Sequence, residues 1–124
     1  MNIISSDKAP AVFGPYSMAI EANGFIYTSG QLGIDPVTNK LCETVGEQVN
    51  QIFKNITAVL EAAGSDLNHV VKTTVFLQNM SDFAIFNELY AKNFGVHRPA
   101  RSTVEVAKLP AQALVEIELI AVKV

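Results

Sequence analysis

One long stretch of the chain has hydrophobic residues at helical spacing, and it predicts a helix from about Val45 to Ala63. Its apolar stripe is made of Val45, Val49, Ile52, Phe53, Ile56, Leu60 and Ala63. Thr44 and Glu47 have the spacing of a capping box, which satisfies backbone amides at the start of a helix. Gly64 is placed to adopt the left-handed conformation that ends one.

A shorter amphipathic stretch predicts a second helix that begins after Ser81 or Asp82 and ends at Gly95. Either of the first two residues can cap it, because both side chains accept hydrogen bonds from first-turn amides. Its apolar face is aromatic and consists of Phe83, Phe86 and Tyr90. Asn87 interrupts that face, so its amide can bond across an interface or cap a neighbouring backbone group.

The remaining hydrophobic segments predict strands. They are a short strand near the N-terminus, Ser17–Ala22, Phe25–Ser29, Val70–Leu77, Ala100–Val106 and Leu114–Val122. Asn23-Gly24 supplies the positive backbone angles of a tight hairpin, and Pro110 separates the last two strands. The order hairpin, helix, strand, helix and two strands predicts an α+β fold. In it, an antiparallel or mixed sheet has both helices on one face.

The last two strands place ionisable residues among apolar ones. Alternation puts Ser102, Val104 and Val106 on one side of the first strand and Arg101, Thr103 and Glu105 on the other. In the second strand, Glu116 and Glu118 lie opposite Val115, Ile117, Leu119 and Ala121. We expect the apolar sets to face the helices, so that Arg101 and Glu116 share the other face of the sheet.

That other face is either solvated or covered by another subunit. Alternating Glu and Arg residues suit the wet face of an antiparallel sheet. Ile120, Val122, Ile26 and Phe76 favour coverage instead, because they add apolar side chains to the same face. The mean hydropathy of +0.26 is high for a small chain. A core rich in Val and Ile would explain it, but burial between symmetric subunits is the favoured explanation.

Composition limits the classes of function. The 124 residues form one domain, 1–124, because two cores would not fit. The single cysteine, Cys42, and the lack of a secretory pattern predict a cytoplasmic protein. No apolar stretch is as long as a membrane span, and the net charge of −3 without a Lys/Arg cluster opposes nucleic-acid binding. His69 and His97 lack metal-ligand spacing, so no metal is expected.

Arg101 and Glu116 are the candidate catalytic pair. A guanidinium offers two parallel donors that match the two oxygens of a carboxylate ligand. A glutamate can hold and polarise a water molecule as a general base. Together they predict a hydrolytic site for a small acid with an electrophilic carbon, although a structural Arg–Glu pair would have the same spacing.

Two loop residues have candidate roles beside this pair. Tyr16 follows Gly14-Pro15, where its phenol can donate to a substrate or pack on the surface. Gly30 ends a strand, where its backbone amide can approach a ligand or simply serve the turn. Neither residue type is specific enough to decide between these alternatives.

Five short segments, in order, resemble the reactive intermediate deaminase (RidA) family from Ala9 to Lys123. They are A-P-A-V-F-G-P-Y-S at Ala9–Ser17, I-Y-T-S-G-Q at Ile26–Gln31, V-V-K-T-T-V-F-L at Val70–Leu77, R-P-A-R-S-T-V-E-V-A-K-L-P at Arg98–Pro110 and L-V-E-I-E at Leu114–Glu118. The resemblance implies a chorismate-mutase-like (RidA) fold. It also implies a homotrimer with a central barrel and a site in each cleft between neighbouring subunits.

The resemblance also implies an activity and the residues that perform it. Family members hydrolyse 2-aminoacrylate and its imine tautomer 2-iminopropanoate, or 2-iminobutanoate, to a 2-keto acid and ammonia without a cofactor. By resemblance, Arg101 grips the substrate carboxylate and Glu116 positions the attacking water. The matching pocket positions are Tyr16, Gly30, Asn87 and Thr103. Position 103 often holds cysteine in this family, so Thr103 removes a reactive thiol.

Two other functions stay open. A regulatory module of the same fold would bind a small carboxylic acid at Arg101 without turnover. RNA cleavage, proposed for some relatives, is opposed by the negative net charge. The expected partners are therefore a small-molecule imine or keto acid and further copies of this chain, with no nucleic acid and no membrane.

Overall fold

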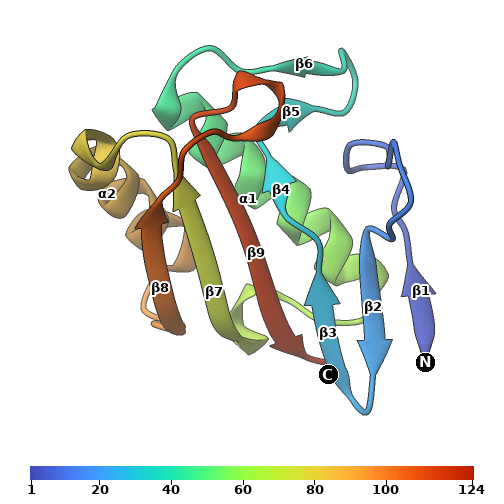
Figure 1. The fold of residues 1–124 in the computed structure, drawn as a ribbon. Helices are drawn as coiled ribbons and strands as arrows, with labels where there is room; N and C mark the ends of the chain where they lie inside the picture. The colour runs from blue at the N-terminus through green and yellow to red at the C-terminus, as the bar shows by residue number, and fades with distance from the viewer.

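In the computed structural model, which describes residues 1–124, both helices lie against one face of a sheet (Figure 1). The helices are α1 (Val45–Ala62) and α2 (Phe83–Phe94). The strands are β1 (Asn2–Ile4), β2 (Ala19–Ala22), β3 (Phe25–Thr28), β4 (Gln31–Leu32), β5 (Ile34–Asp35), β6 (Lys40–Leu41), β7 (Val70–Leu77), β8 (Ala100–Glu105) and β9 (Val115–Val122).

The strand order is β1-β2-β3-β9-β7-β8, with β4 also paired to β9, while β5 and β6 form a separate pair. β8 runs parallel to β7, and the other paired strands are antiparallel. The predicted α+β fold, a mixed sheet with two helices on one face, is therefore confirmed. The short strands β4, β5 and β6 were not predicted, because two residues are too few to show alternation.

α1 begins at the predicted capping box. The Thr44 hydroxyl accepts a hydrogen bond from the Glu47 amide at 3.1 Å, and the Glu47 carboxylate accepts one from the Thr44 amide at 3.0 Å. The predicted apolar stripe is buried between Val49 and Leu60. Gly64 follows the helix with φ of 78°, in the left-handed conformation expected of a helix stop.

α2 begins differently from the prediction. Asp82 itself has a helical backbone conformation, and its side chain makes no capping hydrogen bond. A 3-10 turn at Met80–Asp82 leads into the helix instead, so the expected cap by Ser81 or Asp82 is wrong. Gly95 ends the helix with φ of 69°, as expected.

The aromatic face of α2 packs on α1 and on the sheet. Phe53 of α1 meets Tyr90 and Phe94 edge to face, with ring centroids 5.8 and 5.2 Å apart. The Tyr90 and Thr73 hydroxyls lie 2.7 Å apart in a buried hydrogen bond, which ties α2 to β7. This packing fixes α2 beside the edge strand β8.

The hairpin between β2 and β3 is also as predicted. Asn23 and Gly24 have φ values of 53° and 82°, the positive angles that a tight hairpin turn requires. β3 then pairs with β9.

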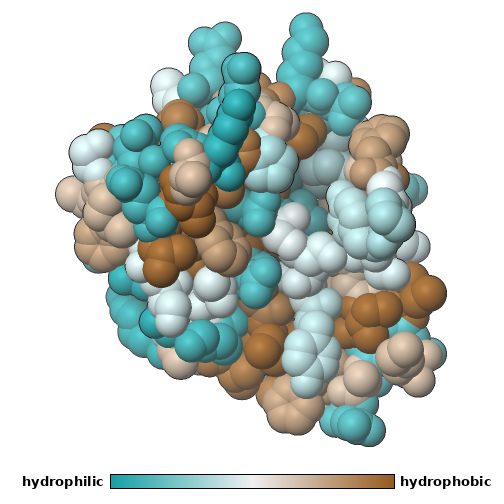
Figure 2. Space-filling view, viewed as in Figure 1, coloured by the Kyte–Doolittle hydropathy of each residue, from teal (hydrophilic) through white to brown (hydrophobic).

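No helix covers the other face of the sheet, which we call the open face (Figure 1). Apolar side chains lie exposed on it: Phe25 is 41% exposed, Tyr27 45% and Val104 43%. Figure 2 shows hydrophobic residues gathered there, around the lower ends of β3 and β9. Ile26 does not belong to this set, contrary to expectation, because it is fully buried on the helix side opposite Ala121.

β8 has the opposite orientation to the predicted one. Arg101 pairs with Thr73 and Thr103 with Val75, and both β7 residues are buried on the helix side. Arg101 and Thr103 therefore face the helices, and the expectation that Arg101 shares a face with Glu116 is wrong. The reason is that both faces of this sheet accept apolar side chains, so Val104 lies on the open face.

Candidate active site

A β-bulge beside β9 forms the base of the first half of the site. From Thr28, the last residue of β3, to Gly30, three residues oppose two residues of β9. The Thr28 hydroxyl accepts a hydrogen bond from the Leu119 amide at 3.0 Å. The Ser29 hydroxyl donates to the Ser17 carbonyl at 2.6 Å. These bonds fix the irregular backbone next to the two glutamates of β9.

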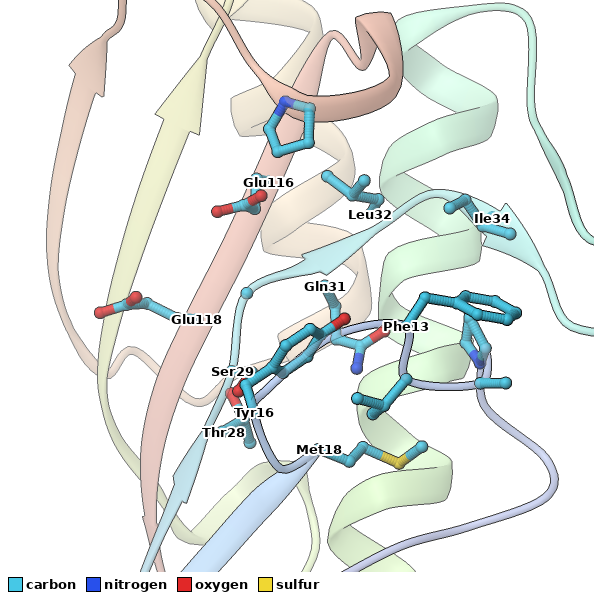
Figure 3. Close-up of a pocket in the computed structure, with 15 residues that line it drawn as sticks. Phe13, Tyr16, Met18, Thr28, Ser29, Gln31, Leu32, Ile34, Glu116 and Glu118 are labelled. Carbon is cyan, nitrogen blue, oxygen red and sulfur yellow. The ribbon is translucent and has the colours of Figure 1, made fainter.

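A cavity of about 690 Å³ lies over this bulge (Figure 3), and we call it the glutamate pocket. Tyr16, Gly30 and Glu116 line it, so the structure brings three of the predicted site residues together. Glu118 also lines it and projects from the same side of β9 as Glu116 (Figure 3). Alternation along β9 placed Glu118 on that face, but its part in a pocket depends on the bulge and was not predicted.

Gly30 is required by the position of the Glu116 carboxylate. A Cβ atom at position 30 would lie 2.5 Å from Glu116 Oε2, closer than any van der Waals contact allows. The absence of a side chain at Gly30 therefore makes room for the carboxylate. This close approach explains the glycine better than a turn does.

The surroundings of Glu116 favour its protonated form more than water does. Burial raises its pKa above the ordinary value, and the charge of Glu118 raises that pKa further. No Lys, Arg or His lines the pocket, and Glu116 takes part in no salt bridge. A glutamate with a raised pKa is a better general base than an exposed one.

The second half of the site is a cavity of about 380 Å³ between α2 and the start of β8, which we call the arginine pocket. Asn87, Tyr90, Arg98 and Arg101 line it, together with Ala91 and Pro99. Asn87 and Arg101 were predicted site residues, whereas Arg98 was not.

Arg101 is held in place by α2. Its Nη1 donates to the Asn87 side-chain oxygen at 2.7 Å. Its guanidinium carbon lies 4.8 Å from the Tyr90 ring centroid and 5.5 Å from that of Phe83, within cation–π range. It makes no salt bridge, so guanidinium donors are left for an anionic ligand. The sequence showed these aromatic residues but not their contact with Arg101, which depends on how α2 packs over β8.

Thr103 lies on the same side of β8 as Arg101. Its hydroxyl oxygen is buried and has no hydrogen-bond partner within the chain. A buried hydroxyl without a partner costs free energy. Thr103 lines neither pocket, so its predicted place in the substrate site stays a prediction.

The two pockets belong to opposite sides of the sheet. Glu116 pairs with Phe76 and extends from the open face, whereas Arg101 pairs with the buried Thr73 and extends toward α2. Within one chain, Arg101 thus lies beside Asn87 in one pocket, and Glu116 lies with Tyr16 and Gly30 in the other. The arginine and the glutamate do not meet.

The chain contains neither a cluster of metal-ligating side chains nor a membrane-spanning helix. No group of three or more His, Cys, Asp and Glu side chains is placed to hold a metal ion. Neither helix combines the length and the apolar character needed to cross a membrane.

The chain is similar to known proteins over nearly its whole length. Residues 6–123 match the family described as Endoribonuclease L-PSP. The chain is 49% identical over 120 residues to Reactive Intermediate Deaminase A, chloroplastic, of Arabidopsis thaliana. The aligned residues make up 96% of this chain and 64% of that protein. The chain is also 48% identical over 122 residues to the 2-iminobutanoate/2-iminopropanoate deaminase of Mus musculus, covering 98% and 90%.

A solved structure has the same fold. The crystal structure of RidA from the Antarctic bacterium Psychrobacter matches with a TM-score of 0.96 and 48% sequence identity, over 98% of this chain and 99% of that one. The match thus covers both helices and the mixed sheet of this chain.

Proposed function

This chain belongs to the Endoribonuclease L-PSP family, which includes proteins named as reactive intermediate deaminases, and from that premise we propose that it is a hydrolytic deaminase. Its substrates are the reactive enamine and imine acids 2-aminoacrylate, 2-iminobutanoate and 2-iminopropanoate. Its products are 2-keto acids and ammonia.

One observation carries the proposal. Arg101 and Glu116 are both partly buried, and neither forms a salt bridge. Partly buried charges without an opposite charge beside them cost free energy in the folded chain. A ligand carboxylate facing Arg101 and a reacting water facing Glu116 would explain why the chain has these two charges there.

Arg101 and its neighbours supply binding and orientation. The guanidinium takes the substrate carboxylate in a two-pronged hydrogen bond, while Asn87 and the aromatic rings of α2 keep it from turning away. Thr103 lies two residues from Arg101 on the same side of β8, and we assign it to the same end of the substrate-binding site. A substrate fixed at one end presents its imine carbon in a single direction, and such positioning contributes much of the rate in this kind of reaction.

Glu116 supplies the base. It accepts a proton from water as the water oxygen bonds to the imine carbon, and the C=N double bond becomes the single bond of a carbinolamine. Glu116 then gives that proton to the nitrogen. As the C–N bond breaks and ammonia leaves, Glu116 takes the hydroxyl proton, so that the C=O bond of the 2-keto acid forms. These steps require no metal or organic cofactor, because a protonated imine carbon is already electrophilic.

We infer that each complete site forms between two protomers, because the two groups lie on opposite faces of one chain. A homotrimer in which the open faces meet in a central barrel suits the exposed Phe25, Tyr27 and Val104. In such an assembly the arginine pocket of one protomer faces the glutamate pocket of its neighbour.

A coupled assay tests the proposed activity. A threonine dehydratase releases 2-iminobutanoate from threonine, and the appearance of 2-oxobutanoate is timed with and without this protein. We expect faster keto-acid release at the same dehydratase rate. Unchanged release in the presence of a folded oligomer would contradict the proposal.

A regulatory module is the second candidate function, because the arginine pocket holds a complete set of carboxylate donors without Glu116. Glu116→Gln separates the two functions. For a deaminase we expect turnover to fall by about 10²- to 10⁴-fold, the usual contribution of a general base, with binding of 2-oxobutanoate retained. Wild-type protein that binds 2-oxobutanoate but accelerates no imine hydrolysis would favour regulation.

A further inference from the structure

The arginine pocket contains a second guanidinium besides Arg101. Arg98, an exposed residue before β8, lines the same cavity of about 380 Å³. Its Nη1 donates to the backbone carbonyls of Gly95 and His97 at the end of α2. No hydrogen bond of its Nη2 or Nε is found within the chain. The side chain is therefore tethered by one nitrogen while its other donors stay free.

Both guanidiniums line the cavity that Tyr90 also lines. Burial raises the pKa of the Tyr90 hydroxyl, whereas its hydrogen bond with Thr73 and the charges of Arg101 and Arg98 lower it. Both cations are thus close enough to influence the same oxygen. No Asp or Glu lines the pocket, and neither arginine forms a salt bridge.

A substrate with one carboxylate can neutralise only one of these charges. The imines in the proposed function each carry a single carboxylate, which Arg101 takes. Arg98 then faces a small polar cavity with guanidinium donors unused. A small ligand with two acidic groups would satisfy both arginines, because both line one cavity of about 380 Å³.

On the basis of the proposed function, we propose that Arg98 is a specificity-determining residue that favours imines with an acidic side chain. The chemical class is that of 2-imino dicarboxylic acids, as formed by oxidation of glutamate or aspartate. Arg101 holds the carboxylate next to the imine carbon, as before. Arg98 holds the carboxylate at the far end.

A competing explanation places Arg98 in contact with the protein rather than with the substrate. If the glutamate pocket of a neighbour lies opposite, Glu118 can form a salt bridge with Arg98 across the interface, since it is an exposed carboxylate without a partner in its own chain. In that case Arg98 would support assembly and would not distinguish one ligand from another.

Ligand binding separates the two explanations without any turnover. The probes are 2-oxoglutarate and 2-oxobutanoate, stable keto acids with two carboxylates and one, measured by titration calorimetry on the assembled protein. We expect wild-type protein to bind 2-oxoglutarate more tightly. We expect Arg98→Gln to lower the ratio of the two affinities about tenfold, the effect of losing one hydrogen-bonded ion pair.

Lys92→Gln is the matched control, because Lys92 is an exposed cation in the last turn of α2 outside the pocket. It makes the same change of net charge and should leave the ratio unchanged. Arg98→Lys keeps the charge but loses the planar donors, and it should restore only part of the selectivity. Equal weakening of both keto acids by Arg98→Gln, or no preference in the wild type, would overturn the inference.

Turnover measurements distinguish a failure of this inference from a failure of the proposed function. The imines of glutamate and 2-aminobutyrate are generated in the assay by an amino-acid oxidase, and kcat/KM is measured for each. We expect Arg98→Gln to raise KM for the dicarboxylic imine with little change in kcat. Turnover that does not depend on Arg98 overturns the inference alone. A protein that hydrolyses neither imine overturns the proposed function, whatever the calorimetry shows.

Discussion

The Glu116 carboxylate lies against the backbone of Gly30, and this contact gives the first test at the scale of single residues. In Gly30→Ala the new methyl group would need the space that Oε2 occupies, at 2.5 Å from the Cβ position. Because displacement of a reacting group by about 1 Å can cost 10²-fold, we expect kcat/KM to fall by at least tenfold. Steady-state kinetics on the folded variant measures this.

Gly24→Ala is the control for Gly30→Ala. Gly24 has φ of 82°, and a Cβ there would meet nothing within 4 Å. We expect a loss of stability of about 1 kcal/mol from the left-handed backbone, with kcat/KM unchanged. If the two variants lose activity equally, the contact with Glu116 has no special role.

Glu118 gives a prediction about pH. The pKa of Glu116 is raised by burial and, to a smaller extent, by the charge of Glu118. A general base must be ionised, so turnover falls as pH decreases through the pKa of Glu116. Glu118→Gln removes the smaller cause and lowers that pKa. We therefore expect the acidic limb of the kcat/KM profile to move to lower pH, and a shift to higher pH would contradict the account.

The residue types of the site could be predicted from the sequence, but their neighbours could not. An arginine suited to a carboxylate and a glutamate suited to water predict a hydrolytic site from the sequence alone. Arg98 and the aromatic residues against Arg101 act only because α2 packs over the edge strand β8. That packing brings together segments that are far apart in the sequence, and the spacing of residues within each segment does not predict it.

At the scale of elements, the capping box of Thr44 and Glu47 stabilises the first turn of α1. Thr44→Ala removes the side-chain half of the capping box, and we expect a loss of about 1 kcal/mol of stability. Asp82→Ala is the matched comparison, because Asp82 precedes α2 without a capping hydrogen bond. Its effect should be smaller than that of Thr44→Ala in chemical denaturation. An equal effect would mean that the cap at Thr44 contributes nothing specific.

The strands show what the alternation of apolar and polar residues predicts and what it does not. Alternation correctly assigned the two faces of β9, because a row of buried residues identifies the helix side there. In β8 it separated the residues into the right two sets but assigned each set to the wrong face. β8 is an edge strand with a half-exposed burial pattern, so neither set is clearly the buried one. Its side is fixed by the parallel register with β7, which the sequence does not specify.

At the scale of the whole molecule, the open face is expected to bury its apolar side chains between protomers. Val104→Lys places a charge on that face, where Val104 is 43% exposed in the single chain. We expect dissociation in analytical ultracentrifugation together with loss of turnover. Val37→Lys, at a position 91% exposed on the β5–β6 connection, should leave both unchanged. An oligomer that survives Val104→Lys would show that another surface holds it together.

In the proposed assembly, Arg101 of one protomer and Glu116 of its neighbour act on the same substrate. This arrangement is tested by mixing two inactive variants, Arg101→Ala and Glu116→Gln, under conditions in which subunits exchange. In a cyclic trimer every mixed oligomer contains one intact pair of residues, so an equal mixture should recover about a quarter of wild-type turnover. No recovery, in a sample whose mixed oligomers are demonstrated by native mass spectrometry, would contradict the account.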